Sequence, residues 1–292
     1  MENTINKKID KIIMKKVLTN NMATLFLVAT PIGNLNEVSR RTIDVLNNVN
    51  VIACEDTRNS LKLFSHFDIH TRFITYHNFN EEESTKGILK LLEEGNDVAL
   101  ISDAGYPLIS DPGYVLVNAV INEGYTVTTV SGPNAALNAL VSSGMETQHY
   151  LYYGFLSPKL SQAKKELESL VNFPYTMIFY EAPHRIEKTL QTCLNVFGDR
   201  KAVLARELTK LHETFHRGNL SDLCKLTDLK GEMVLIIEGY KEEKKDVDIS
   251  IFINEINELI NNGNKTKQAV NTVAEKYKYS KNVLYNQYLK SK

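Results

Sequence analysis

Apolar, strand-like segments alternate with helix-like segments along residues 25–143, and this alternation limits the fold more than any other feature of the chain. Short runs rich in β-branched residues, such as Leu25 to Ala29, Val49 to Cys54 and Asn96 to Leu100, predict buried strands. Between such runs, helical periodicity predicts helices at residues 39–46, 85–94 and 113–122. The pattern predicts an α/β fold whose first domain, residues 23–131, holds a mainly parallel sheet with helices on both faces.

The pattern of expected strands and helices changes from residue 149 onward. Strands are expected at residues 150–156, 175–180, 201–206, 212–217 and 232–238, and helices at residues 160–171 and 185–196. This higher strand content predicts a second α/β domain, residues 132–240, built on a mixed sheet. The crevice between two such domains is the expected ligand site.

Lysine-rich segments flank these two domains. Residues 1–22 form an N-terminal extension in which isoleucines recur at helical spacing, which predicts a short amphipathic helix or a loose arm. Residues 241–248 have the composition of a linker. Residues 249–292 predict three short helices of helix-turn-helix type.

Charge is distributed unevenly over the 292 residues. Residues 1–22 carry five lysines against two acids and residues 249–292 carry seven against three, so residues 23–248 hold a net charge of −8 within an overall −1. Such an acidic body excludes a protein that simply coats nucleic acid, although the basic ends could contact phosphate. The three cysteines, without CxxC spacing, and the lack of an apolar run of about 18 residues predict a soluble, cytoplasmic protein with no membrane contact.

The least generic segment is the loop from Ile101 to Gly113, which directly follows an expected strand. In an open α/β sheet ligands bind beyond the carboxyl ends of the strands, so Asp103, Ala104 and Gly105 would lie where a cofactor binds. Small side chains at these positions would let a ligand approach the backbone, and two prolines restrict the course of the loop. Taken by itself, the loop is equally explained as an ordinary polar βα connection.

One short motif matches a zinc protease signature. His212 and His216 enclose Glu213 in the pattern HExxH, which binds zinc only when a helix brings both histidines onto one face. In a strand the two histidines would lie about 13 Å apart, too far to share one ion. Periodicity permits either structure, but no histidine follows His216, and we therefore expect a strand and no metal site.

Polar residues follow two of the strands expected in the second domain. Glu181, His184 and Arg185 come after the strand at 175–180, and Glu207 and Lys210 after the strand at 201–206. Each residue of this kind is more often a surface or capping group than a catalyst, but their shared placement at strand ends points to the expected crevice. The sequence holds no P-loop, GxGxxG fingerprint or GxSxG elbow.

Eight motifs occur in an order that indicates a family. They are Thr-Pro-Ile-Gly-Asn-Leu (30–35), Glu-Asp-Thr-Arg (55–58), Ser-Asp-Ala-Gly (102–105), Ser-Asp-Pro-Gly (110–113), Gly-Pro-Asn-Ala-Ala (132–136), Phe-Tyr-Glu-Ala-Pro-His-Arg (179–185), Ala-Arg-Glu-Leu-Thr-Lys (205–210) and Gly-Glu-Met-Val-Leu (231–235). Together they resemble the tetrapyrrole methylase superfamily, and within it the bacterial 16S rRNA cytidine 2′-O-methyltransferases. The resemblance covers residues 24–239, and residues 249–292 resemble the small helix-turn-helix appendage of that family.

The resemblance implies a two-domain α/β methylase, usually a homodimer, that binds S-adenosylmethionine in the interdomain cleft. Carried onto this chain, the cofactor would contact Pro31, Asp103, Ala104, Gly105, Ser131, Gly132, Pro133, Asn134, Ala135, Phe155, Glu232 and Met233. Three positions depart from the family pattern. Tyr106 stands where threonine is usual, and Asn134 and Ala182 stand where serine is more frequent.

The implied reaction moves a methyl group from a sulfonium to a cytidine 2′-hydroxyl in the decoding region of 16S rRNA, within the small ribosomal subunit. It requires in-line positioning and removal of the hydroxyl proton. The groups to consider as bases are Glu55, Glu181, His184, Glu207 and Lys210, whereas His184, Arg185, Arg206 and Lys210 could instead hold phosphate or ribose. Two alternatives stay open, namely methylation of a tetrapyrrole or other small molecule, and a ribosome assembly factor without turnover.

Overall fold

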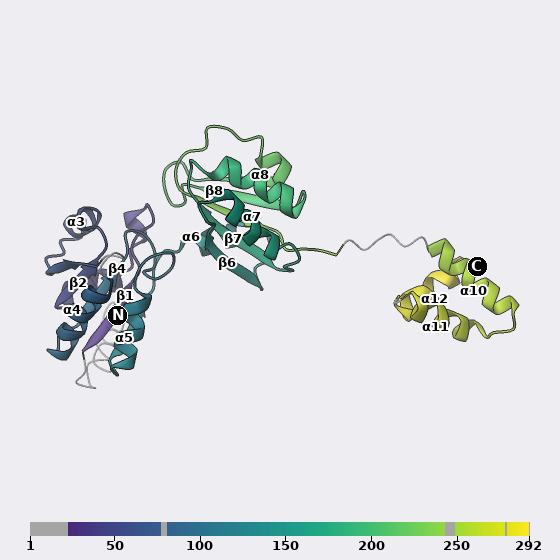
Figure 1. Cartoon of the computed structure of the whole chain (residues 1–292), viewed down its shortest axis with the longest axis horizontal. Helices are drawn as coiled ribbons and strands as arrows, with labels where there is room; N and C mark the ends of the chain where they lie inside the picture. The colour runs from purple at the N-terminus through teal and green to yellow at the C-terminus, as the bar shows by residue number, and fades with distance from the viewer. Residues whose placement is uncertain (1–22, 77–80, 243–248, 278, 292) are drawn as a thin grey trace, which may run out of the picture. The chain divides into compact units, whose positions relative to one another are not determined.

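The computed structural model describes residues 23–76, 81–242, 249–277 and 279–291. The helix or arm predicted for residues 1–22 and most of the predicted linker therefore lie outside the described residues. The chain separates into two compact units, Met1–Tyr240 and Lys241–Lys292 (Figure 1). Within its described residues the first unit contains two five-stranded sheets.

A parallel sheet forms the N-terminal half of the first unit. Its strands, in spatial order, are β3 (Phe73–Thr75), β2 (Val51–Cys54), β4 (Val98–Ile101), β1 (Thr24–Val28) and β5 (Thr126–Val130). All four strand pairs are parallel, which confirms the predicted sheet. The connections contain the 3-10 helix η1 (Leu35–Glu37) and the helices α2 (Arg40–Asn48), α3 (Thr57–His66), α4 (Glu81–Glu93) and α5 (Tyr114–Asn122).

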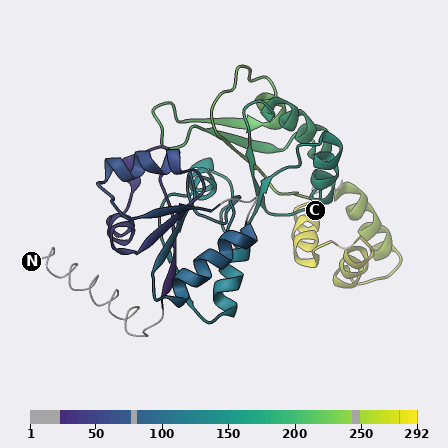
Figure 2. The same ribbon diagram turned by 60° about the vertical axis from the view of Figure 1, so that its left-hand side comes forward.

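Alternate residues of each strand face opposite hydrophobic cores. In β1, Phe26 and Val28 pack into the core that contains residues of α2 and α3, whereas Leu25 and Leu27 pack into the core that contains residues of α4 and α5. Helices therefore cover both faces of the sheet, as predicted, and Figure 2 shows this arrangement from a second direction. Burial on both faces explains why β1, β2 and β4 are almost continuous apolar runs.

The sequence patterns do not predict α3, and they place the start of α4 at Thr85 rather than Glu81. Helix α3 has few apolar residues in the core, because Leu63 and Phe64 supply most of its apolar contribution. Its start is nevertheless marked by Asp56, whose side chain accepts a hydrogen bond from the backbone N–H of Arg58 at 2.8 Å. This unpredicted helix turns out to hold a residue of the candidate site.

A mixed sheet forms the C-terminal half of the first unit, as predicted. Its strand order is β6 (Tyr150–Phe155), β7 (Thr176–Glu181), β10 (Met233–Ile237), β8 (Lys201–Arg206) and β9 (Thr214–Asn219). The β6–β7 pair is parallel and the other pairs are antiparallel. One face packs against α7 (Leu160–Ser169), α8 (Ile186–Phe197) and α9 (Leu220–Leu223), and the other against α6 (Ala135–Ser143).

The core beneath α6 joins the two halves of the first unit. Ile32, from the loop that follows β1, is buried in this core together with Leu208 and residues of β7, β8 and β10. A loop of the parallel half thus packs on the sheet of the mixed half. The contact places the carboxyl ends of the first sheet next to the second sheet.

The second unit has its own hydrophobic core. It consists of α10 (Ile249–Asn261), α11 (Thr266–Lys276) and α12 (Lys281–Lys290), which agree with the helices predicted there. Phe252, Ile256, Val273, Leu284 and Tyr288 are buried between these helices. This packing makes the unit a small helical domain with an independent core.

Candidate functional site

The loops that follow β1 and β4 are joined by backbone hydrogen bonds. The N–H of Thr30 donates to the carbonyl of Gly105 at 2.9 Å, and the N–H of Gly105 donates to the carbonyl of Thr30 at 3.1 Å. The Ser102 hydroxyl also donates to the Gly105 carbonyl, at 3.1 Å. Gly105 has a φ of +79°, which favours glycine at this position. These bonds fix the backbone of the loop that the sequence predicts to bind a cofactor.

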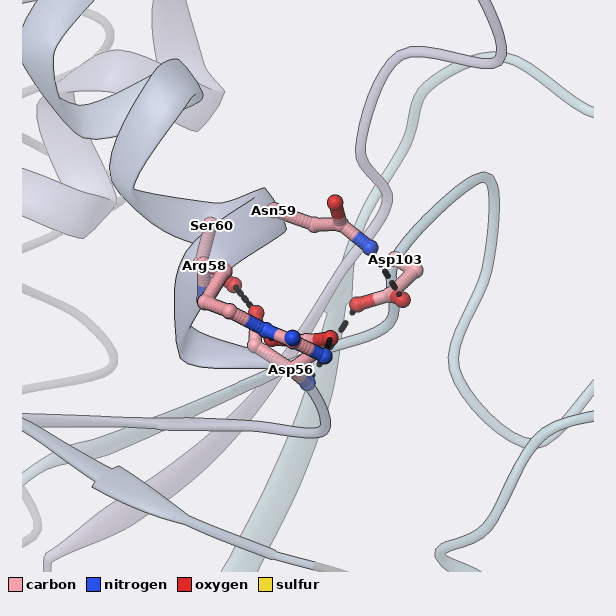
Figure 3. Close-up of polar contacts among 5 residues, drawn as sticks. All are labelled: Asp56, Arg58, Asn59, Ser60 and Asp103. Carbon is pink, nitrogen blue, oxygen red and sulfur yellow. Dashed lines mark hydrogen bonds and ion pairs between the residues drawn. The ribbon is translucent and has the colours of Figure 1, made fainter.

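Asp103 is oriented by the first residues of α3 (Figure 3). Its Oδ2 accepts a hydrogen bond from Asn59 Nδ2 at 2.8 Å, and its Oδ1 accepts one from the backbone N–H of Asp56 at 3.4 Å. Arg58, whose side chain is 87 % exposed, pairs with Asp56 at 2.7 Å and lowers the pKa of that carboxyl to about 2. The Glu-Asp-Thr-Arg motif (55–58) thus supplies one of the two donors that fix the Asp103 carboxylate, and Asn59, the residue after the motif, supplies the other.

A cavity of about 370 Å³ lies between the two halves of the first unit, within the size range of small-molecule sites. The parallel half contributes the loop after β4 and Ile32, and the mixed half contributes the start of α6 and the ends of β6, β7 and β10. The lining residues are Ile32, Asp103, Ala104, Gly105, Tyr106, Ile109, Ser110, Asp111, Asn134, Ala135, Phe155, Tyr180, Glu181, Ala182, Pro183, Leu208, Glu232, Met233 and Val234.

The residues predicted to bind a cofactor fall into two groups. Those that line the cavity are Asp103, Ala104, Gly105, Asn134, Ala135, Phe155, Glu232 and Met233. Pro31 instead lines a smaller neighbouring cavity of about 120 Å³, which shares Asp103 with the larger one. Ser131, Gly132 and Pro133 belong to the loop before α6 and do not line the larger cavity.

Tyr106, one of the departures from the family pattern, connects two of the loops around the cavity. Its ring lines the cavity, and its phenol oxygen accepts a hydrogen bond from the backbone N–H of Gly132 at 3.1 Å. The side chain therefore ties the loop after β4 to the loop after β5. Gly132 thereby contributes to the shape of the cavity without lining it.

Glu181 and Arg185, two of the predicted catalytic residues, form a buried ion pair. Arg185 Nε lies 3.1 Å from Glu181 Oε1, and the Glu181 side chain is completely buried. Glu181 also accepts hydrogen bonds from the Thr189 hydroxyl at 2.6 Å and the Ala182 N–H at 2.9 Å. Arg185 donates to the carbonyls of Leu156 and Ser157. These bonds connect the ends of β6 and β7 to the start of α8, which is a structural arrangement.

Glu207 and Lys210, also predicted as catalytic residues, form a second charged group with Glu232. Lys210 Nζ lies 2.9 Å from Glu207 Oε1 and 3.1 Å from Glu232 Oε2. The Lys210 hydrogen bond, followed by one from the Glu232 backbone, lowers the pKa of Glu207. Burial lowers the pKa of Lys210, but its bonds to the two carboxylates outweigh burial and raise it. Of the three residues only Glu232 lines the cavity, where it would present a carboxylate already paired with an ammonium group.

The HExxH match does not form the helix that a zinc site requires. His216 lies in β9 (Thr214–Asn219), whereas His212 lies in the turn before that strand, so the strand predicted for residues 212–217 is confirmed only from Thr214 onward. Across the described ranges no group of three or more histidine, cysteine, aspartate or glutamate side chains could hold a metal ion. His184, another predicted catalytic residue, is exposed and does not line the cavity. None of the helices described is long and apolar enough to cross a membrane.

Two residues of the site were not identified from the sequence. Asn59 lies on the unpredicted helix α3, so its bond to Asp103 could not be anticipated. Asp111 belongs to the quoted Ser-Asp-Pro-Gly motif, and it lines the cavity. Burial, followed by the nearby charges of Glu55 and Asp103, raises the pKa of Asp111 to about 7.

The fold and the position of the cavity define the class of the protein. A family model described as Tetrapyrrole (Corrin/Porphyrin) Methylases matches residues 24–224, and the chain belongs to this family. Over most of its length it is similar to proteins named Ribosomal RNA small subunit methyltransferase I. The relative from Streptococcus pyogenes serotype M3 is 41 % identical over 273 residues, which cover 91 % of this chain and 94 % of the relative. The relative from Bacillus subtilis strain 168 is 39 % identical over 277 residues, with 92 % and 95 % covered.

Two solved structures share the fold at low sequence identity. Diphthine synthase superposes with a TM-score of 0.59 at 12 % identity, covering 74 % of this chain and 90 % of that one. Uroporphyrin-III-C-methyltransferase from Thermus thermophilus superposes with a TM-score of 0.52 at 18 % identity, covering 74 % and 94 %. The predicted fold class and the family resemblance are thus confirmed.

Proposed function

We propose that the protein is an S-adenosylmethionine-dependent methyltransferase of ribosomal RNA, acting on a cytidine 2′-hydroxyl in the decoding region of 16S rRNA within the small subunit. The observation that carries the proposal is the similarity, at about 40 % identity over nine-tenths of the chain, to relatives whose name states rRNA methylation. The cavity between the two α/β halves supports it, since most of the residues that the family resemblance assigns to the cofactor line that cavity.

The residues that line the cavity suit S-adenosylmethionine. This cofactor lacks phosphate groups, so it needs apolar walls, backbone groups and a carboxylate rather than a cationic loop. Asp103, Ala104 and Gly105 would hold it on one side and Asn134, Ala135, Phe155, Glu232 and Met233 on the other, with Pro31 and the Ser131–Gly132–Pro133 turn supporting them. At Gly105 an added Cβ would make an ordinary contact with Ile32 at 3.5 Å, so the φ of +79° rather than lack of space favours glycine there. When bound, the cofactor supplies an activated methyl group on a sulfonium.

Tyr106→Phe is expected to weaken S-adenosylmethionine binding about two- to tenfold, because one net hydrogen bond contributes roughly 0.5–1.5 kcal/mol. The variant loses the bond from Gly132 and keeps the ring in the cavity wall. Calorimetric titration of the purified protein measures the effect. Tyr125→Phe, at a half-buried tyrosine outside the cavity, is the matched control. An unchanged affinity in Tyr106→Phe would show that the bond does not shape the cofactor site.

The helical unit is proposed to contact the ribosomal subunit. Residues 249–292 carry seven lysines and three acids, in contrast to the acidic body. Deleting them is expected to weaken subunit binding about tenfold or more and to flatten its salt dependence, because fewer phosphates are neutralised. The cofactor affinity should stay within about twofold, because the unit has a separate core. Equal losses of subunit and cofactor binding would contradict a docking role.

Methylation assays with three different methyl acceptors distinguish the proposed function from its alternatives. The protein is incubated with methyl-labelled S-adenosylmethionine and, separately, unmethylated small subunits, free 16S rRNA and a porphyrin precursor. Label on the subunits is the expected result, because the acidic body lacks a broad basic face and should need the assembled surface. Label only on the porphyrin precursor would show a small-molecule methyltransferase. Absence of cofactor binding at millimolar concentration would show an assembly factor. The size of the active particle, expected to be a homodimer, follows from its mass in solution.

A further inference from the structure

Asp111 differs from the other acidic residues of the cavity. Asp103, Glu181 and Glu232 each have a fixed donor, supplied by Asn59, Arg185 and Lys210 respectively. Among the described residues no hydrogen bond or ion pair engages the Asp111 carboxylate, although it lines the same cavity. This carboxyl group is therefore the acid of the cavity that is available to a ligand.

The surroundings of Asp111 disfavour its charged form. Glu55 and Asp103 lie close enough to repel the carboxylate, and together with burial they raise its pKa to about 7. The other groups that face it are the phenols of Tyr152 and Tyr180, whose pKa values are raised chiefly by burial and partly by Asp111. The described residues that line the cavity include no lysine or arginine, and the two cations paired with its acids, Arg185 and Lys210, are held by those other carboxylates. Near neutral pH the group therefore exchanges readily between the acid and the carboxylate.

We propose that Asp111 accepts the proton that the substrate hydroxyl loses on methylation, and that a positively charged cofactor prepares it by favouring its carboxylate form. The inference deepens the proposed function and rests on it. The hydroxyl oxygen forms a bond to the methyl carbon, the carbon–sulfur bond breaks with its electron pair left on sulfur, and the hydroxyl proton passes to Asp111. One negative carboxylate and one positive sulfonium become a neutral acid and a neutral thioether, so charge and atoms balance.

The charges around Asp111 favour its ionised form before methyl transfer and its protonated form afterwards. A cation in the cavity lowers the pKa of a nearby carboxyl, so Asp111 would be ionised while the methyl donor is bound. Once the positive charge has been lost, the repulsion from Glu55 and Asp103 again favours the protonated acid. Asp111 would thus be a stronger base after methyl transfer than before it, and would retain the proton until the product leaves.

The test compares S-adenosylmethionine with S-adenosylhomocysteine, which has the same adenosine and amino acid parts but no charge on sulfur. Calorimetric titrations of the full chain at pH 5.5 to 8.5 give the ratio of the affinity for S-adenosylmethionine to the affinity for S-adenosylhomocysteine. The ratio is expected to rise about tenfold with increasing pH, corresponding to a pKa lowered by about one unit in the charged complex. Near pH 7, binding of S-adenosylmethionine should also release about half a proton per site, which an indicator dye detects. Binding of S-adenosylhomocysteine should release none.

Asp111→Asn, which resembles the neutral acid in shape, should remove both the pH dependence of the ratio and the proton release. Asp68→Asn, which removes an exposed carboxylate outside the cavity, should keep both. A ratio independent of pH in the unmodified protein, or a pH dependence that persists in Asp111→Asn or is lost equally in Asp68→Asn, would overturn the assignment to Asp111. Absence of binding of either ligand at every pH would instead contradict the proposed function.

Discussion

Asp103→Asn is expected to weaken S-adenosylmethionine binding about ten- to a hundredfold. The loop after β4 presents this carboxylate in a single orientation, because Asn59 and the Asp56 backbone both donate to it. A hydrogen bond to a charged group contributes roughly 1.5–3 kcal/mol, which corresponds to that range of affinity. The asparagine variant keeps the size of the side chain and an acceptor for Asn59, so it removes mainly the charge. Calorimetric titration at pH 8 measures the loss.

The control for Asp103→Asn is Asp68→Asn. Asp68 is an exposed aspartate that contacts His70, and its φ of +53° is a conformation that asparagine accepts well. It should leave both the cofactor affinity and the free energy of unfolding unchanged. If Asp103→Asn bound the cofactor as tightly as the unmodified protein, the cavity beneath the β4 loop would not be the cofactor site.

Arg185→Ala is expected to destabilise the first unit by about 3–5 kcal/mol, because it leaves the completely buried Glu181 carboxylate without its cation. It also removes the bonds to the carbonyls of Leu156 and Ser157. Denaturant unfolding, followed by circular dichroism, measures the change. The double variant Glu181→Gln with Arg185→Ala should be less destabilised than Arg185→Ala, since no buried charge then remains unpaired.

Arg40→Ala is the matched control for the loss of an arginine. Arg40 is exposed and lies 4.0 Å from Asp44, so its removal should change the free energy of unfolding by no more than about 0.5 kcal/mol. If Arg185→Ala instead kept normal stability and lost only substrate binding, Arg185 would hold phosphate or ribose. That result would support the role suggested by its position at a strand end in the sequence.

The two sheets could be predicted because their signals are local. Continuous apolar runs mark strands buried on both faces, and the higher strand density after residue 149 indicated the mixed sheet. Helix α3 was not predicted, because few of its side chains reach the core. Asp56, the residue that caps its N-terminus, was a sequence signal for a helix start at this position. Asp103, Ala104 and Gly105 follow β4 and line the cavity, at the strand end where a ligand site was predicted, because strand ends define that edge of the sheet.

The remaining features of the site depend on contacts between distant segments. The sequence shows that Glu181 and Arg185 follow a strand, but their pairing with each other and with Thr189 appears only when α8 packs on the sheet. Asp111 has no local sign of a raised pKa, because the effect requires burial in the cavity and the approach of Glu55 and Asp103. Gly132 likewise acts through Tyr106, 26 residues away.

The position of the transferred methyl group tests the proposed function most directly. Unmethylated small subunits are incubated with the protein and labelled S-adenosylmethionine, the 16S rRNA is extracted, and the modified nucleotide is identified by nuclease mapping and mass spectrometry. We predict one methyl group on the 2′-oxygen of a cytidine ribose in the decoding region. A methyl group on a base, or on a nucleotide outside that region, would contradict the proposal.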